Sequence, residues 1–152
     1  MALPLFLPPR ETGPANWPGM ELYAATILLE AEAEPDEGKL GVAWVIRQRM
    51  DARRQDLHEI ILSRLQFSCW NDDFSGSRRA RLIAPDPEVW ARCWWAACAA
   101  YWRLLRDPTH GADHYLNPVL TRASRLDRGL PSWYDPALVT ATIGAHEFLR
   151  LG

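Results

Sequence analysis

The sequence predicts a mainly helical fold of the α+β class, in which a small sheet packs on a helical body. Apolar residues recur at helical spacing in several segments before residue 108, whereas the remainder mixes turn residues with short runs that favour strands. The chain has 152 residues, 48% of them hydrophobic, which is enough for one core of ordinary size. We therefore expect a single domain over residues 20–152.

The N-terminal half is expected to hold three helices behind an extended arm. Residues 1–19 are rich in proline, which cannot propagate a helix, so they are expected to lie extended on the domain. Helix formers dominate over about residues 20–34, and Pro35 predicts the end of this helix. Further helices are expected over about residues 36–49 and 56–65.

The best-defined element follows a polar loop. Asp86 is a favourable N-cap, and Pro87 suits the first helical position. Apolar residues then recur at helical spacing as far as Asp107 and Pro108, namely Trp90, Trp94, Ala97, Tyr101 and Leu104 or Leu105. Beyond Pro108 we expect loops and a small sheet or hairpin on the helical body.

Composition excludes several classes of protein. The formal net charge is -2 and no block of like charges occurs, so the electrostatic footprint of a nucleic-acid binder is missing. Three cysteines without a paired-cysteine motif predict reduced thiols rather than a disulfide framework. The first ten residues lack the basic start and cleavage site of a signal peptide, and no apolar run approaches the roughly 20 residues that cross a bilayer. We expect a soluble monomer without stable membrane association.

Glu30 interrupts an apolar helical run, where an uncompensated carboxylate is costly. Helical spacing places it near Thr26 and Ile27, and a poorly solvated carboxyl there would have a raised pKa. A raised pKa is what a general acid working near neutral pH requires. The alternative is an exposed acidic helix end, and periodicity does not distinguish Glu30 from Glu32 or Glu34.

A second cluster of polar residues lies in the segment HGADH. His110, Asp113 and His114, together with His146, are residue types that suit zinc. The spacing is not that of a helical zinc site and no thiol is near in sequence, so structural or substrate-contacting histidines are the preferred interpretation. We expect neither a metal ion nor a cofactor.

The chain has eight tryptophans, which divide into two groups. Trp44, Trp90 and Trp94 fall on expected helical core faces. Trp70 and Trp133 fall in expected loops, where an aromatic side chain can support the apolar face of a sugar ring or anchor the loop.

The segment Glu30 to Arg49, EAEAEPDEGKLGVAWVIRQR, resembles the entry motif of the cell-wall hydrolase family that includes spore-cortex-lytic enzymes and phage endolysins. That motif reads roughly E-A-x-G-E-P, then x-x-G-x-x-A-V-A-x-V-x-x-N-R. Ala33 stands where glycine is usual, and Gln48 where asparagine is usual. Similar blocks follow in the family's order: QFSCW at 66–70, ADHYLNP at 112–118, Pro131 with Trp133, and IGAHEF at 143–148.

The resemblance implies a lysozyme-like or lytic-transglycosylase-like helical domain that cuts the glycan strands of peptidoglycan. The first glutamate of the motif is the catalytic acid in such enzymes, so the resemblance assigns this role to Glu30. It further implies that a larger group of residues binds substrate or supports the site: Glu34, Gln66, Ser68, Trp70, His114, Tyr115, Asn117, Trp133 and His146.

Two outcomes are open once Glu30 has protonated the oxygen between N-acetylmuramic acid (MurNAc) and N-acetylglucosamine (GlcNAc). In a lytic transglycosylase, which we prefer, Glu30 then acts as base on the 6-hydroxyl of MurNAc and a 1,6-anhydro ring closes. In a hydrolytic muramidase, Asp72 or Asp73 would be a second carboxylate, about 5 to 5.5 Å away if nucleophile and about 6.5 to 9.5 Å away if base.

Two rival functions follow from the same residues. A catalytically inactive peptidoglycan-binding domain is compatible with the departures at Ala33 and Gln48, and a zinc-dependent hydrolase would use the histidines to cut stem peptides. The expected setting is that of a compact phage or prophage endolysin. Such a protein accumulates in the host cytoplasm and reaches the wall when a holin opens the membrane.

Overall fold

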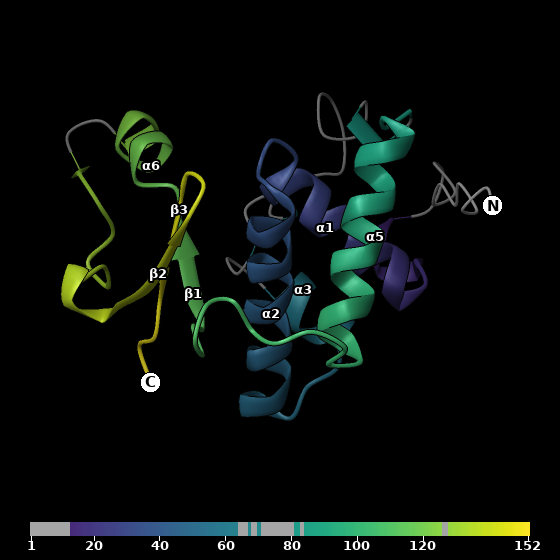
Figure 1. Cartoon of the computed structure of the whole chain (residues 1–152), viewed down its shortest axis with the longest axis horizontal. Helices are drawn as coiled ribbons and strands as arrows, with labels where there is room; N and C mark the ends of the chain where they lie inside the picture. The colour runs from purple at the N-terminus through teal and green to yellow at the C-terminus, as the bar shows by residue number, and fades with distance from the viewer. Residues whose placement is uncertain (1–12, 64–66, 68–69, 71–80, 83, 126–127) are drawn as a thin grey trace.

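The computed structural model describes residues 13–63, 67, 70, 81–82, 84–125 and 128–152 of the chain. It confirms the mainly helical α+β fold predicted from the sequence (Figure 1). The elements are, in order, the 3-10 turn η1 (Pro14–Asn16), α1 (Gly19–Ala31), α2 (Asp36–Arg53), α3 (Leu57–Leu62), α5 (Pro87–Tyr101), β1 (His114–Leu116), α6 (Pro118–Arg125), the 3-10 turn η4 (Pro136–Leu138), β2 (Val139–Ile143) and β3 (His146–Leu149).

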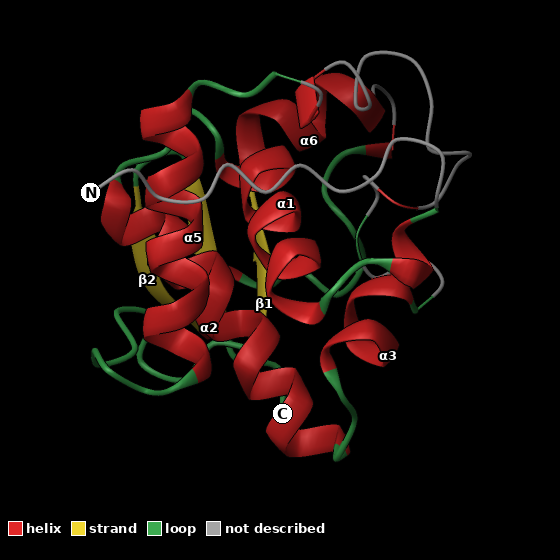
Figure 2. Ribbon diagram, turned by 90° about the vertical axis from the view of Figure 1, so that its right-hand side faces the viewer, coloured by secondary structure: helices red, strands yellow, loops and turns green. Residues whose placement is uncertain are grey.

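Helix α2 lies between the two parts of the fold. It packs against α1, α3 and α5 and also contacts β1 and β2 of the sheet (Figure 1). The sheet is antiparallel with strand order β1-β3-β2, and in the view of Figure 2 its strands lie behind the helices. Two layers, one helical and one made of the sheet with α6, therefore face each other.

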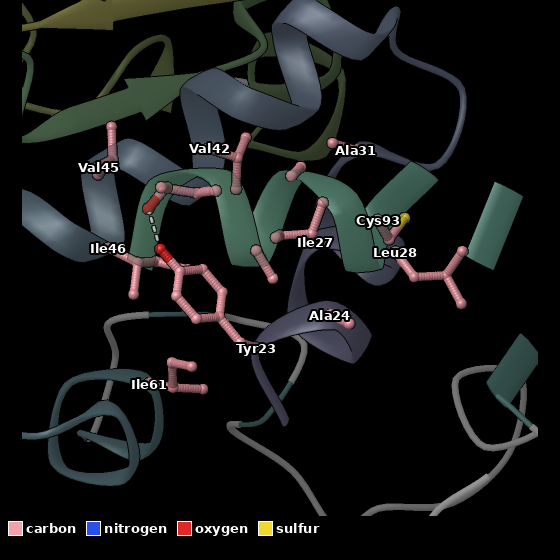
Figure 3. Packing of buried hydrophobic residues seen from close by; sticks show 14 of the residues in the cluster. Tyr23, Ala24, Ile27, Leu28, Ala31, Val42, Val45, Ile46, Ile61 and Cys93 are labelled. Carbon is pink, nitrogen blue, oxygen red and sulfur yellow. Dashed lines mark hydrogen bonds between the residues drawn. The ribbon is translucent and has the colours of Figure 1, made fainter. Parts of the chain in front are cut away.

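The core is formed by the apolar faces of α1, α2 and α5 (Figure 3). Tyr23 of α1 is fully buried, and its hydroxyl donates a hydrogen bond to the main-chain carbonyl of Ala43 on α2. Burial raises the pKa of Tyr23, so it remains a protonated donor. Trp44 and Trp90 are buried, which confirms the core positions predicted for them.

Helix α1 ends at Ala31, three residues before the predicted end. The reason lies on α2, where the buried ammonium group of Lys39 donates to the main-chain carbonyl oxygens of Glu32, at 3.0 Å, and Glu34. These carbonyls are bonded outside the helical pattern, and Pro35 disfavours a helical conformation at the residue before it. The chain therefore turns between Ala31 and α2.

Helix α5 begins as predicted and ends earlier than predicted. The Asp86 carboxylate accepts hydrogen bonds from two main-chain N–H groups of the first turn, at 2.9 and 3.2 Å. The expected continuation to Leu104 or Leu105 is wrong, because Arg103 adopts a φ of 53° and the N–H of Leu104 returns to the carbonyl of Ala99 at 2.8 Å. Leu104 is consequently 69% exposed and Leu105 44% exposed.

Two other segments differ from the expectation. In the arm predicted to be extended, residues 14–16 form η1 and Trp17 is buried in the core; residues 1–12 lie outside the described part. Helix α6 was expected to be loop, strand or hairpin. In it, the side-chain oxygen of Asn117 accepts the N–H of Leu120 at 3.1 Å, as an N-cap does.

Among the described residues, no helix combines the length and the apolar composition needed to cross a membrane.

Candidate active site

A cleft of about 1050 Å³ lies where the helical layer meets the sheet and α6. Leu29 and Glu30 from the last turns of α1 and Arg49 from α2 line it from the helical layer. The sheet, α6 and the loop after α6 supply the other described lining residues: His114, Tyr115, Leu116, Asn117, Leu120, Thr121, Ala123, Ser124, Arg125, Pro131, Trp133 and His146.

Glu30 is half-buried at the cleft surface, in the electrostatic neighbourhood of Arg49. Arg49 is 7% exposed; its Nε donates to the main-chain carbonyl of Asp113 at 2.8 Å, and its guanidinium lies 5.3 Å from the centre of the Phe67 ring. Burial lowers the pKa of Arg49, and the charges of Asp113 and Glu30 oppose that shift. The Arg49 guanidinium and the candidate acid therefore line the same cleft and interact electrostatically.

The fold separates the three glutamates that periodicity left equivalent. Glu32 is exposed and forms an ion pair with Arg81, at 2.7 Å between Nη2 and Oε2. The Glu34 carboxylate accepts the main-chain N–H of Ala145, at 3.3 Å to Oε1 and 3.2 Å to Oε2. Of the three, Glu30 is the one that lines the cleft.

His146 occupies the start of β3, and Glu34 lies directly behind it. Its Nδ1 is 3.2 Å from Oε1 of Glu34, and both side chains are largely buried. Burial lowers the pKa of His146 while the carboxylate of Glu34 raises it, and the net shift is downward. A largely buried imidazole with a lowered pKa, close to the Glu34 carboxylate, therefore lines the cleft.

On the sheet side, Asp113 holds His114 in place. Nδ1 of His114 donates to Oδ1 of Asp113 at 2.9 Å, and the same carboxylate accepts the main-chain N–H groups of Leu151 and Gly152 at 2.8 and 3.2 Å. Burial alone would raise the pKa of Asp113, but these hydrogen bonds outweigh it and the pKa is lowered. The His114 ring lies 5.1 Å from that of Trp133, which is 37% exposed.

The family model described as Cell Wall Hydrolase matches residues 33–149. The chain belongs to the cell wall hydrolase family. No curated protein and no solved structure matches it. The membership identifies an enzyme that degrades peptidoglycan, and the match begins three residues after Glu30.

The cleft of this hydrolase gathers five of the nine supporting residues predicted from the sequence: His114, Tyr115, Asn117, Trp133 and His146. Trp70 instead packs on the core, where its indole N–H donates to Oγ1 of Thr26 at 3.0 Å and its ring meets the edge of Trp17. Glu34 lies behind His146. Gln66, Ser68, Asp72 and Asp73 lie outside the described residues.

Sequence reasoning missed Arg49 as a cleft residue and the whole contribution of α6. Arg49 belongs to the entry motif, so the resemblance itself carried a signal for it. The signal for α6 was the pair Asn117-Pro118, an N-cap followed by proline at the first helical position. The cleft-lining face of α6 comprises Leu120, Thr121, Ala123, Ser124 and Arg125.

The histidines considered as zinc ligands do not form one cluster. In the part of the chain that the structure describes, no three His, Cys, Asp or Glu side chains come together in a way that could hold a metal ion. His110 is exposed, at a φ of 56°. Asp113 is bonded to His114 and to the C-terminal main chain, and His146 lies against Glu34.

Proposed function

We propose that this cell wall hydrolase cleaves the glycosidic bond between MurNAc and GlcNAc, with Glu30 as the proton donor, as a lytic transglycosylase. The observation that supports it is the position of Glu30, half-buried in a large cleft between the two layers. Among the described residues that line this cleft, Glu30 is the one carboxylic acid. A single carboxyl group that serves first as acid and then as base matches that arrangement.

The chemistry of the cleft walls suits a glycan strand. Its volume, about 1050 Å³, is slightly above the roughly 300–1,000 Å³ of small-molecule sites. Trp133 and Tyr115 offer aromatic faces to sugar rings, while Thr121 and the amide of Asn117 offer hydrogen bonds to acetamido and hydroxyl groups. Both kinds of surface are needed because a sugar ring has apolar faces and a polar edge.

The proposed reaction balances without water. Protonated Glu30 donates its proton to the oxygen that bridges MurNAc and GlcNAc, and the bond from C1 of MurNAc to that oxygen breaks as positive charge develops on the MurNAc ring. The Glu30 carboxylate then takes the proton of the MurNAc 6-hydroxyl while O6 bonds to C1. The products are GlcNAc with a free 4-hydroxyl and a 1,6-anhydro-MurNAc end, and Glu30 is protonated again.

Two alternatives predict different products. A hydrolytic muramidase would place Asp72 or Asp73 opposite Glu30 and leave a reducing MurNAc end, heavier by one water. A catalytically inactive domain would bind peptidoglycan and release no fragment.

The test is mass spectrometry of the fragments released from purified peptidoglycan. We expect 1,6-anhydro-MurNAc ends with the native protein, and reducing ends would establish the muramidase instead. Glu30→Gln keeps the shape of the side chain and removes the acid, so we expect the rate to fall by at least about 10³-fold. Glu32→Gln is the matched control because its side chain is exposed and paired outside the cleft, and its rate should be that of the native protein.

Two further results would contradict the proposal. A folded Glu30→Gln protein with native activity would remove Glu30 from the reaction. Loss of native activity on addition of a chelator would favour the zinc-dependent hydrolase.

We also propose the endolysin role for this enzyme, as the sequence predicts. Cytoplasmic expression alone should leave a susceptible host intact, and expression together with a pore-forming protein should lyse it. Lysis without the pore would contradict this role.

A further inference from the structure

Among the described residues that line the cleft of this hydrolase there are two arginines, one on each layer. Arg49 projects from α2, and Arg125 is the last residue of α6. A cation in a cleft that binds a polymer of sugars needs an explanation, because sugar hydroxyls and acetamido groups carry no charge.

Arg49 already has contacts within the protein. Its Nε bonds to the carbonyl of Asp113 and its guanidinium covers the Phe67 ring, while Glu30 lies in its electrostatic field. These contacts give Arg49 a structural reason to be where it is.

Arg125 has no comparable partner within the described residues. Its Nε–H is buried and donates to no carbonyl or carboxylate of the described residues, and no described acidic side chain forms an ion pair with it. A buried donor without an acceptor is costly, and a guanidinium is best satisfied by a planar oxyanion such as a carboxylate. The neighbouring cleft residues on α6, Thr121 and Ser124, carry hydroxyl groups but no charge.

We propose that Arg125 binds a carboxylate of the muramyl substituent in the cleft, so that the enzyme prefers strands whose MurNAc residues carry a negative charge. This inference rests on the proposed glycan-strand substrate. MurNAc differs from GlcNAc by a lactyl ether, whose acid group is free on a bare strand and carries the stem peptide on a substituted one. The charge can therefore come from the lactyl carboxylate or from carboxylates of the stem.

Three substrates separate these sources. Peptide-free strands present the lactyl carboxylate, peptide-bearing strands present stem carboxylates, and peptide-bearing strands with methyl-esterified carboxyl groups present neither. The native enzyme should cut the esterified strands most slowly. The substrate that the native enzyme cuts fastest identifies the carboxylate that Arg125 binds.

The variant is Arg125→Gln, and the matched control is Arg122→Gln on the same helix. Arg122 is exposed and does not line the cleft, so its replacement makes the same change in net charge without altering the site. We expect kcat/KM of Arg125→Gln to fall about tenfold or more on the preferred charged strand and to be unchanged on the esterified strand. Arg125→Lys, which keeps a charge but not the planar fork, should recover part of the loss.

Binding measured in a Glu30→Gln background separates this inference from the proposed reaction. If the native enzyme releases no fragment but muropeptides bind in a way that Arg125→Gln weakens and methyl esterification abolishes, the reaction fails and the inference stands. An equal loss on charged and esterified strands would overturn the inference. So would native activity and binding in Arg125→Gln, which would leave Arg125 a cation that merely stabilises the C-terminal end of α6.

Discussion

His146 is a buried imidazole enclosed by Glu34, Tyr115 and Phe148, and it lines the same cleft as Glu30. Burial lowers its pKa below the usual value of about 6.5, so the unfolded chain binds the proton more readily than the folded one. The stability due to neutral His146 is fully present above about pH 6.5 and is lost as the pH falls towards the lowered pKa of the folded state.

We therefore expect the free energy of unfolding to fall between pH 7 and pH 5, with a contribution from His146 of up to about 1.4 kcal/mol per pH unit. Urea denaturation at a series of pH values measures it. His146→Gln should remove this component of the slope, whereas replacement of the exposed His110 should leave the slope unchanged. An unaltered slope in His146→Gln would mean that the imidazole is not held neutral.

At the same scale, the glutamates of the entry motif show what the residue pattern alone could not predict. The spacing of Glu30, Glu32 and Glu34 does not decide which of them faces a cleft. In the structure the chain turns after Ala31, where Lys39 donates to the carbonyls of Glu32 and Glu34, and the Glu34 carboxylate accepts the N–H of Ala145 in the turn before β3. Resemblance to a family selected Glu30 because it contains such long-range information implicitly.

At the scale of elements, the turn between β2 and β3 depends on Gly144. Its φ is 57°, and a Cβ there would lie 2.0 Å from Oε2 of Glu34. Gly144→Ala should therefore destabilise the protein by about 1 to 3 kcal/mol, because it adds backbone strain and displaces the Glu34 carboxylate, which bonds to Ala145 and lies close to His146. Thermal unfolding measures the stability, and the rate of peptidoglycan digestion should fall with it.

Gly129 offers the matched control for this substitution. Its φ is 62°, but a Cβ there would meet nothing within 4 Å. Gly129→Ala thus reports the cost of the left-handed backbone alone, and the difference between the two variants reports the contact with Glu34. Equal losses in both variants would show that the approach of Glu34 to the turn has no energetic importance.

Local signals predicted the start of α5, whereas the end of α5 and the whole of α6 were not predicted. The α5 start followed from Asp86 and Pro87, whose effect is local. Its end could not be predicted, because Arg103 adopts the left-handed conformation that glycine usually adopts at the end of a helix. Helix α6 carried the local signal Asn117-Pro118, but it is short and has no buried residue in the structure, so no core face marks it as a helix.

For the molecule as a whole, the cleft depends on contacts that fix the position of the helical layer relative to the sheet. The contacts between them include the Arg49 bond to Asp113, the Glu34 bond to Ala145 and the packing of Phe148 against α2 at Gly41. The sequence predicted the class of fold and, through the resemblance, six of the fifteen described residues that line the cleft. It could not predict the relative position of the two layers, since each of these contacts joins residues far apart in the chain.

A substitution at Gly41 tests whether the relative position of the two layers controls activity. A Cβ at Gly41 would lie 2.7 Å from Cζ of Phe148, 3.0 Å from its Cε1 and 3.1 Å from Cγ2 of Thr109, and the Phe148 ring is fully buried. Gly41→Ala should gain about 1 kcal/mol in helix propensity but lose about 1 to 3 kcal/mol to overpacking, so α2 and the sheet must move apart. We expect a lower kcat at a temperature where the variant is fully folded.

The matched control is Gly19→Ala in α1, where the nearest atom to the added Cβ, Cδ1 of Leu57, lies at an ordinary 3.4 Å. This variant should be as stable as the native protein or slightly more stable, with native kcat, because it makes the same change of residue away from the contact between the layers. If Gly41→Ala also kept native kcat while its stability fell, the cleft would tolerate separation of the layers. The activity of Glu30 would then not depend on the exact position of the sheet relative to α2.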